Sequence, residues 1–148
     1  MPEPPACETL ADALREVFET MLFTCVYAEI PGGKPPGSIE ARLPFGGGRN
    51  GEFRLAISPE AARSIAAGFL GEEDENQIGE AQIGDVVCEV TNMVCGSLLS
   101  RMGTDLAFDL QPPRLTWQDA EDGPCGCTAR TFDLGNGSVT VGIQFEQS

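Results

Sequence analysis

A long helical segment constrains the fold of this 148-residue chain more than any other feature. Residues 78–102 contain no proline, and apolar side chains recur around most of the helix they would form. A helix that is apolar over most of its circumference must be buried against other elements. The apolar positions are Val86, Val87, Val90, Met93, Val94, Cys95, Leu98, Leu99 and Met102. The sequence therefore predicts a largely buried helix that ends at Gly103.

One narrow polar stripe interrupts this helix. At ~100° per residue, Asp85, Glu89, Asn92 and Gly96 fall within about 60° of each other. The stripe holds no lysine or arginine to pair with Glu89, whereas a solvated stripe more often carries mixed charges. A glycine inside a helix costs about 1 kcal/mol relative to alanine and is tolerated where something approaches the backbone closely. The residues alone leave two interpretations open, a solvated helix face or a functional surface.

The other segments predict two more helices and a sheet. Apolar spacings of three and four predict a helix from Glu8 that ends before Tyr27. Alternating residues at 39–45 and 53–57, separated by a glycine-rich turn, predict a β-hairpin. Ser58 as a capping hydroxyl and Pro59 start a helix that ends at Leu70 and Gly71. Further strands are expected at 106–110, 128–134 and 138–146, the last being an exposed strand.

This order of elements predicts the fold class. It implies an α+β fold, with one antiparallel sheet and three helices packed on one face. A length of 148 residues fits one domain, so we expect residues 1–148 to form a single unit. Residues 1–7 contain three prolines and are expected to be a flexible N-terminal end.

Charge and hydropathy exclude several classes of partner. The net charge is −14, from 23 acidic and 9 basic residues, so nucleic acid and anionic membranes should repel the chain. The acidic run 72–75 is expected to be a solvated loop. No signal peptide is recognisable, and no uninterrupted apolar run reaches the ~18 residues of a membrane span. We therefore expect a cytoplasmic protein with no membrane partner.

The six cysteines are expected to be mostly free and buried, as in a reducing compartment. Cys125 and Cys127 are close enough to bind a metal or to form a redox pair. The chain has no histidine, and zinc requires four ligands, so this signal is weak. We expect no intrinsic metal or cofactor.

The polar stripe resembles the motif of a known family. Asp85, Glu89 and Asn92, followed 21 residues later by Pro113, resemble the pattern of the CheC/CheX/FliY response-regulator phosphatases. Segment 89–96, with Met93 and Gly96, is similar to the family's motif helix, and segment 51–58 is similar to its strand and helix entry. The resemblance covers about residues 8 to 146.

This resemblance implies hydrolysis of the aspartyl-phosphate of a CheY-like receiver domain. Asn92 would orient the attacking water, and Glu89 would contact a lysine of the receiver. Asp85, Gly96 and Pro113 would shape the surface that binds the partner. Mg²⁺ would be supplied by the phosphorylated receiver rather than by this chain.

The resemblance also implies a single site, as in CheX-like members. The first helix carries acids at the first two motif positions, Asp12 and Glu16, but Glu19 stands where asparagine is needed. Family members also dimerise through their sheets, and an exposed final strand would permit a homodimer.

Three other functions stay open at this point. The first is a receiver-binding module of a two-component or chemotaxis pathway that hydrolyses nothing, because a fold does not guarantee an activity. Retention of both Glu89 and Asn92 argues against it. The second is a structural protein of the flagellar switch. The third is an unrelated hydrolase that uses Asp85 and Glu89 as an acid pair on small substrates.

Overall fold

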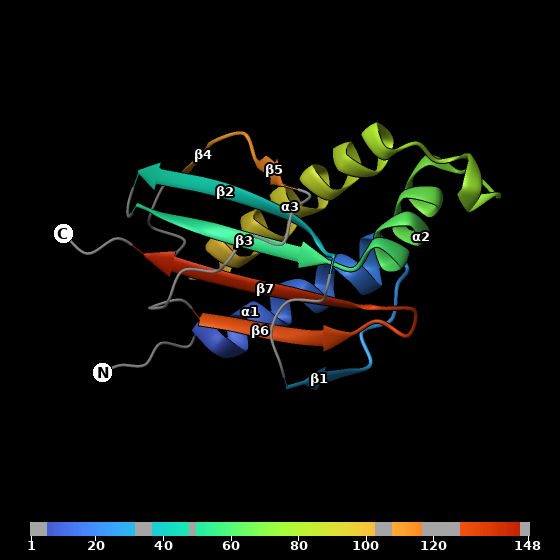
Figure 1. Cartoon of the computed structure of the whole chain (residues 1–148). Helices are drawn as coiled ribbons and strands as arrows, with labels where there is room; N and C mark the ends of the chain where they lie inside the picture. The colour runs from blue at the N-terminus through green and yellow to red at the C-terminus, as the bar shows by residue number, and fades with distance from the viewer. Residues whose placement is uncertain (1–5, 32–36, 48–49, 103–107, 117–127, 146–148) are drawn as a thin grey trace.

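The fold has two layers, a sheet and a set of helices that cover one of its faces (Figure 1). The computed structural model describes residues 6–31, 37–47, 50–102, 108–116 and 128–145. Seven strands form one sheet in which every pairing is antiparallel. In this view α1 and the C-terminal part of α3 lie behind the strands, and α2 lies at the right, beside the N-terminal part of α3. The predicted α+β class, with helices on one face of an antiparallel sheet, is confirmed.

Helix α3 (Glu80–Met102) is the long helix that the sequence predicted, and it starts two residues later than expected. It packs against α1, α2 and the strands β2, β3 and β5. Val94, Cys95 and Leu98 are fully buried on its inner side. Part of this helix is long and apolar enough to cross a membrane, but 56% of that window is buried inside the fold. Such burial is typical of the core helix of a globular domain.

The sheet order is β1-β6-β7-β3-β2-β4, and β5 also pairs with β2. The predicted hairpin is β2 with β3, in a register that places Leu43 opposite Phe53. The strands are β1 (Ala28–Ile30), β2 (Ile39–Gly47), β3 (Gly51–Ile57), β4 (Phe108–Leu110), β5 (Arg114–Thr116), β6 (Thr128–Asp133) and β7 (Ser138–Phe145). The sequence did not predict β1 and β5, because three residues are too short to show a period.

The prediction of an exposed final strand was wrong. Strand β7 lies inside the sheet, where it pairs with β6 on one side and with β3 on the other. Its backbone hydrogen bonds are therefore used within the fold, and β7 offers no edge for a second copy. The edges are formed instead by the short strands β1 and β4, with β5 beside β4 along β2.

Helix α2 (Pro59–Leu70) begins and ends where the sequence predicted, with Gly71 in the left-handed conformation at φ 73°. The capping role predicted for Ser58 was wrong, since its hydroxyl makes no capping hydrogen bond. Ser58 Oγ instead accepts a hydrogen bond from the backbone amide of Ser138 (3.1 Å). The hydroxyl thus fastens the start of α2 to β7, because these two segments meet at the end of the sheet.

The predicted first helix is divided in two. Helix α1 (Ala6–Arg15) continues into a wider π-helical turn, η1 (Glu16–Met21), which buries Val17 and Phe18. Phe23 follows with a φ of 53°, an uncommon conformation for a bulky residue. The amide of Thr24 donates to the carbonyl of Phe18 (2.8 Å), which closes the turn. Periodicity of three and four could not distinguish this turn from an α-helix.

Some predictions fall outside the described residues. They concern the Gly103 helix stop, Cys125, Cys127 and most of the N-terminal end, residues 1–5. The acidic run 72–75 is exposed as predicted, and its end belongs to a short 3₁₀ turn, η2 (Glu75–Gln77).

We expect Gly137→Ala to destabilise the protein, because a Cβ at this position would collide with the side chain of Ser58. Overpacking of this kind costs about 1–3 kcal/mol. Urea denaturation of both variants measures the effect, with Gly68→Ala as the control. Gly68 lies in α2 with open space around it, so that substitution should raise stability by up to about 1 kcal/mol. Equal denaturation midpoints for the two variants would contradict the packing seen between β7 and α2.

Candidate functional site

The polar stripe lies on the solvent side of α3, as the sequence predicted. Asp85 and Glu89 are exposed, and Asn92 and Gly96 are half-buried. Residues three and four apart on a helix lie on the same face, so these positions form one surface. Pro113 is half-buried and immediately precedes β5, a strand that contacts α3. The structure thus joins four of the predicted site residues on one helix and places Pro113 beside a strand that packs on that helix.

The stripe side chains have no internal partners. Among the described residues, the side chains of Asp85, Glu89 and Asn92 make no hydrogen bond or ion pair. The basic residue of α3, Arg101, does not neutralise the stripe, since it pairs with Glu16 on the neighbouring η1. Two carboxylates and a carboxamide are therefore free to bind something outside the chain.

The carboxylates also influence Cys88, which lies one turn before Asn92. Burial raises the pKa of the Cys88 thiol, and the negative charges of Asp85 and Glu89 raise it further. Burial alone raises the pKa of the Cys95 thiol from 9.0 to about 12. Because the thiolate is the reactive form, both thiols stay protonated and inert at neutral pH. Neither is suited to nucleophilic chemistry.

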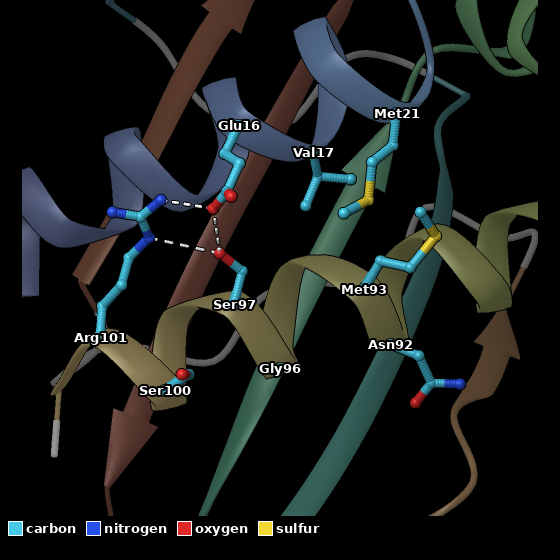
Figure 2. Close-up of a pocket in the computed structure, with 9 residues that line it drawn as sticks. All are labelled: Glu16, Val17, Met21, Asn92, Met93, Gly96, Ser97, Ser100 and Arg101. Atoms are coloured by element: carbon cyan, nitrogen blue, oxygen red, sulfur yellow. Dashed lines mark hydrogen bonds and ion pairs between the residues drawn. The ribbon is translucent and has the colours of Figure 1, made fainter. Parts of the chain in front are cut away.

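A groove of about 560 Å³ runs between α3 and η1, and Asn92 stands at its edge (Figure 2). Val17, Met21 and Met93 form an apolar part, and Gly96 lies between this part and the polar end. The lining residues are Glu16, Val17, Met21, Asn92, Met93, Gly96, Ser97, Ser100 and Arg101. Sequence reasoning missed most of them, because the groove joins two segments more than 70 residues apart.

Glu16, Ser97 and Arg101 close the polar end of the groove. Ser97 Oγ donates to Glu16 Oε1 (3.1 Å), and Arg101 Nε donates to Ser97 Oγ (3.3 Å). An Arg101 guanidinium nitrogen also pairs directly with Glu16 Oε1 (Figure 2). These hydrogen bonds from Arg101 and Ser97 lower the pKa of Glu16, which keeps it ionised. The network ties η1 to the last turns of α3.

Glu19 also has a structural partner. Its Oε2 accepts a hydrogen bond from the amide of Val26 (3.1 Å) and lies 3.8 Å from Arg15 Nη1. Glu16 and Glu19 occupy the positions on the first helix that correspond to Glu89 and Asn92 on α3 in the motif. Both are engaged in contacts within the chain, whereas their counterparts on α3 are free. The two helices are therefore not equivalent surfaces.

Comparison with known proteins identifies the family. The family model described as chemotaxis phosphatase CheX matches residues 39–122, more than half of the chain. The chain belongs to the CheX family. The match includes Glu89, Asn92 and Pro113, the residues on which the resemblance was first based. Comparison with curated proteins finds no match.

Solved structures of CheX and CheC-like proteins share the fold. The chemotaxis protein CheX of Vibrio vulnificus superposes with a TM-score of 0.78 at 19% identity, over 99% of both chains. A CheC-like superfamily protein of Shewanella sp. PV-4 gives 0.75 at 22% identity, over 99% of this chain and all of the other. The CheX–CheY–BeF₃–Mg²⁺ complex of Borrelia burgdorferi gives 0.75 at 20% identity, over 95% and 97% of the chains. In that complex a CheX protein is bound to CheY together with Mg²⁺.

Within the described part of this CheX-family chain, no group of three or more cysteine and acidic side chains is placed to hold a metal ion. Asp85 and Glu89 lie on one face of α3, and the Cys88 thiol is near enough for their charges to raise its pKa.

We expect the pKa of the Cys88 thiol to lie above the usual range of a thiol, and Asp85→Asn to lower it, because one of the charges that oppose ionisation is removed. The measurement is the pH dependence of alkylation in a variant that keeps Cys88 as its only cysteine. Asp109→Asn, an exposed position on β4, is the control and should leave the midpoint unchanged. An alkylation midpoint of Cys88 that stays the same in the Asp85→Asn variant would contradict the electrostatic effect of Asp85 on this thiol.

Proposed function

We propose that this protein hydrolyses the aspartyl-phosphate of a response-regulator receiver domain, and that Glu89 and Asn92 carry the reaction. The observation that supports this most is the free state of both side chains on one face of a well-packed helix. A rigid helix holds the two groups in a fixed relation, which is what a reaction governed by positioning requires. Membership of a family of chemotaxis phosphatases agrees with this activity.

Asn92 would position the attacking water. Hydrolysis of an acyl phosphate needs a water in line with the leaving carboxylate oxygen, and little acid–base chemistry is needed from the enzyme. A carboxamide both donates and accepts hydrogen bonds, so it can hold a water in one orientation. The half-buried side chain of Asn92 has no partner among the described residues, so no internal bond must break before it does so.

Glu89 would fix the approach of the partner. Its exposed carboxylate lies one turn from Asn92 and is free to pair with a lysine beside the receiver's phosphoryl group. Asp85 would extend the same contact towards the start of α3, and Pro113 would flank it from the segment before β5. Mg²⁺ would come with the receiver and would neutralise charge on the phosphoryl group.

We expect Asn92→Ala to slow receiver dephosphorylation by about 100-fold or more, because the water loses its positioning group. The assay follows the decay of a phosphorylated receiver from the same genome, with Mg²⁺. Stability should change by less than about 1 kcal/mol, since the Asn92 side chain has no internal bond to lose. Asn76→Ala, in the exposed η2 turn, is the matched control and should keep full activity.

Two results would contradict the proposal. If the Asn92→Ala variant unfolded, the stripe would be needed for the stability of the fold and not for catalysis. A folded wild-type protein that accelerates the decay of none of the organism's receivers would favour the non-catalytic binding module.

We expect that Glu19→Asn does not create a second phosphatase site. The substitution supplies the missing amide, but Glu16 stays paired with Arg101 and Ser97, so no free carboxylate accompanies it. The sharpest assay places Glu19→Asn in the Asn92→Ala background and measures receiver decay. Hydrolysis should stay at the level of Asn92→Ala alone. Recovery of even a tenth of the wild-type rate would show that the first helix is an intact second site.

A further inference from the structure

We propose that the groove between η1 and α3 is an apolar docking subsite, which takes an apolar side chain from the receiver next to its phosphorylation site. This inference rests on the proposed function and extends it from the two reacting groups to the contacts that provide affinity. Asn92 belongs both to the reactive stripe and to the groove lining, so an occupant of the groove lies directly beside the reaction.

The walls of the groove are suited to an apolar guest. Met21 and Met93 come from opposite helices, and their side chains reach into the space between them (Figure 2). Met21 is 50% exposed although it is apolar, and it gains burial only when something covers it. Methionine is flexible and polarisable, and it is common at surfaces that adapt to a partner. A volume of about 560 Å³ is large enough for protruding side chains of another protein.

Gly96 provides the second observation. A Cβ added at Gly96 would meet no atom within 4 Å, so packing inside the chain does not require a glycine here. It also has no positive φ, so the backbone does not require one either. A glycine in the interior of a helix destabilises the fold by about 1 kcal/mol relative to alanine. Gly68 in α2 has the same open space but does not line the groove, whereas Gly96 does, so we assign the glycine at 96 to the close approach of a partner at the floor of the groove.

The charges of the groove favour an apolar occupant over an ionic one. The carboxylate of Glu16 and the guanidinium of Arg101 are already paired with each other and bridged by Ser97. A charged guest would have to break this network, whereas an apolar guest leaves it intact. We assign the ionic contact with the receiver to Glu89, which has no partner in the part of the chain that the structure describes.

The net charge of −14 makes apolar contacts more important for this partner. The phosphorylation site of a receiver is itself acidic, so long-range attraction does not bring the two proteins together. Affinity must then come from short-range contacts, and the groove is the apolar surface that adjoins Asn92. A second copy of this chain seated there would instead cover Asn92 and block the reaction, which is why we assign the groove to the receiver.

The test measures binding of a Mg²⁺-loaded, beryllofluoride-activated receiver from the same genome, so that no hydrolysis is needed. Met21→Gln keeps the length of the side chain and removes its apolar character. We expect it to weaken binding by about 3- to 10-fold, since half of a methionine side chain loses its apolar burial. KM for the phosphorylated receiver should rise with little change in kcat, because Glu89 and Asn92 are untouched.

Leu70→Gln is the matched control. Leu70 is 46% exposed at the end of α2 and does not line the groove, so binding and hydrolysis should match the wild type.

Gly96→Ala is the second variant, and it should change stability and receiver binding in opposite directions. It should raise the urea midpoint, because alanine favours the helix, and yet weaken receiver binding by about 5-fold or more through overpacking at the floor. A purely structural role of Gly96 cannot produce this combination.

The outcomes separate this proposal from the proposed function. If the wild type hydrolyses the phosphoreceiver through Asn92, but Met21→Gln and Gly96→Ala both bind the activated receiver normally, the groove proposal is wrong and the proposed function stands. If the wild type binds the activated receiver without hydrolysing it, and both variants weaken binding, the groove proposal stands and the catalytic one fails. If the wild type binds no receiver, or if Met21→Gln instead abolishes a concentration-dependent dimer, the receiver is not the occupant.

Discussion

The burial of α3 is the constraint on which the rest of the structure depends. Its apolar faces are covered by the sheet and by α1 and α2, with Val94, Cys95 and Leu98 fully buried. One side of the helix is left to solvent, and it presents Asp85 and Glu89 exposed and Asn92 half-buried. Because the helix cannot rotate without exposing its core residues, the backbone positions of Glu89 and Asn92 are fixed relative to each other. The same packing that stabilises the domain therefore also holds the candidate reactive groups in place.

Two helices with similar acidic motifs differ in the contacts that their motif residues make within the chain. On η1, Glu16 meets Arg101 and Ser97, and Glu19 meets the amide of Val26. On α3, Glu89 and Asn92 meet no described side chain. An acid that is already paired must give up a charge-assisted bond before it can bind a partner, whereas a free acid need not. This difference, more than the presence of Glu19 in place of an asparagine, is the reason why we propose a binding surface on α3 rather than on η1.

The predictions from sequence were right for elements with a long periodic pattern, and they were wrong or missing where a contact between distant segments determines the structure. Helix α3, its stripe and the β2–β3 hairpin were predictable because their periods extend over many residues. The strands β1 and β5 are too short for a period, and the internal place of β7 depends on strand order, which periodicity does not encode. Ser58 is a common capping residue whose hydroxyl bonds to Ser138 instead, 80 residues away. The groove was not predicted because it too depends on a contact between distant segments, the packing of η1 beside α3.

Three local irregularities of the described fold lie at or near this groove. The π-helical turn from Glu16 to Met21 forms one wall, and Gly96 lies at the floor, inside α3. Phe23, two residues beyond Met21, holds a φ of 53° and is 88% exposed. A glycine inside a helix and a positive φ at a bulky residue each cost about 1 kcal/mol or more. Departures from local rules that cluster at one place indicate a functional surface. This clustering links the groove to the reactive stripe, because Asn92 and Gly96, residues of the stripe, also line the groove.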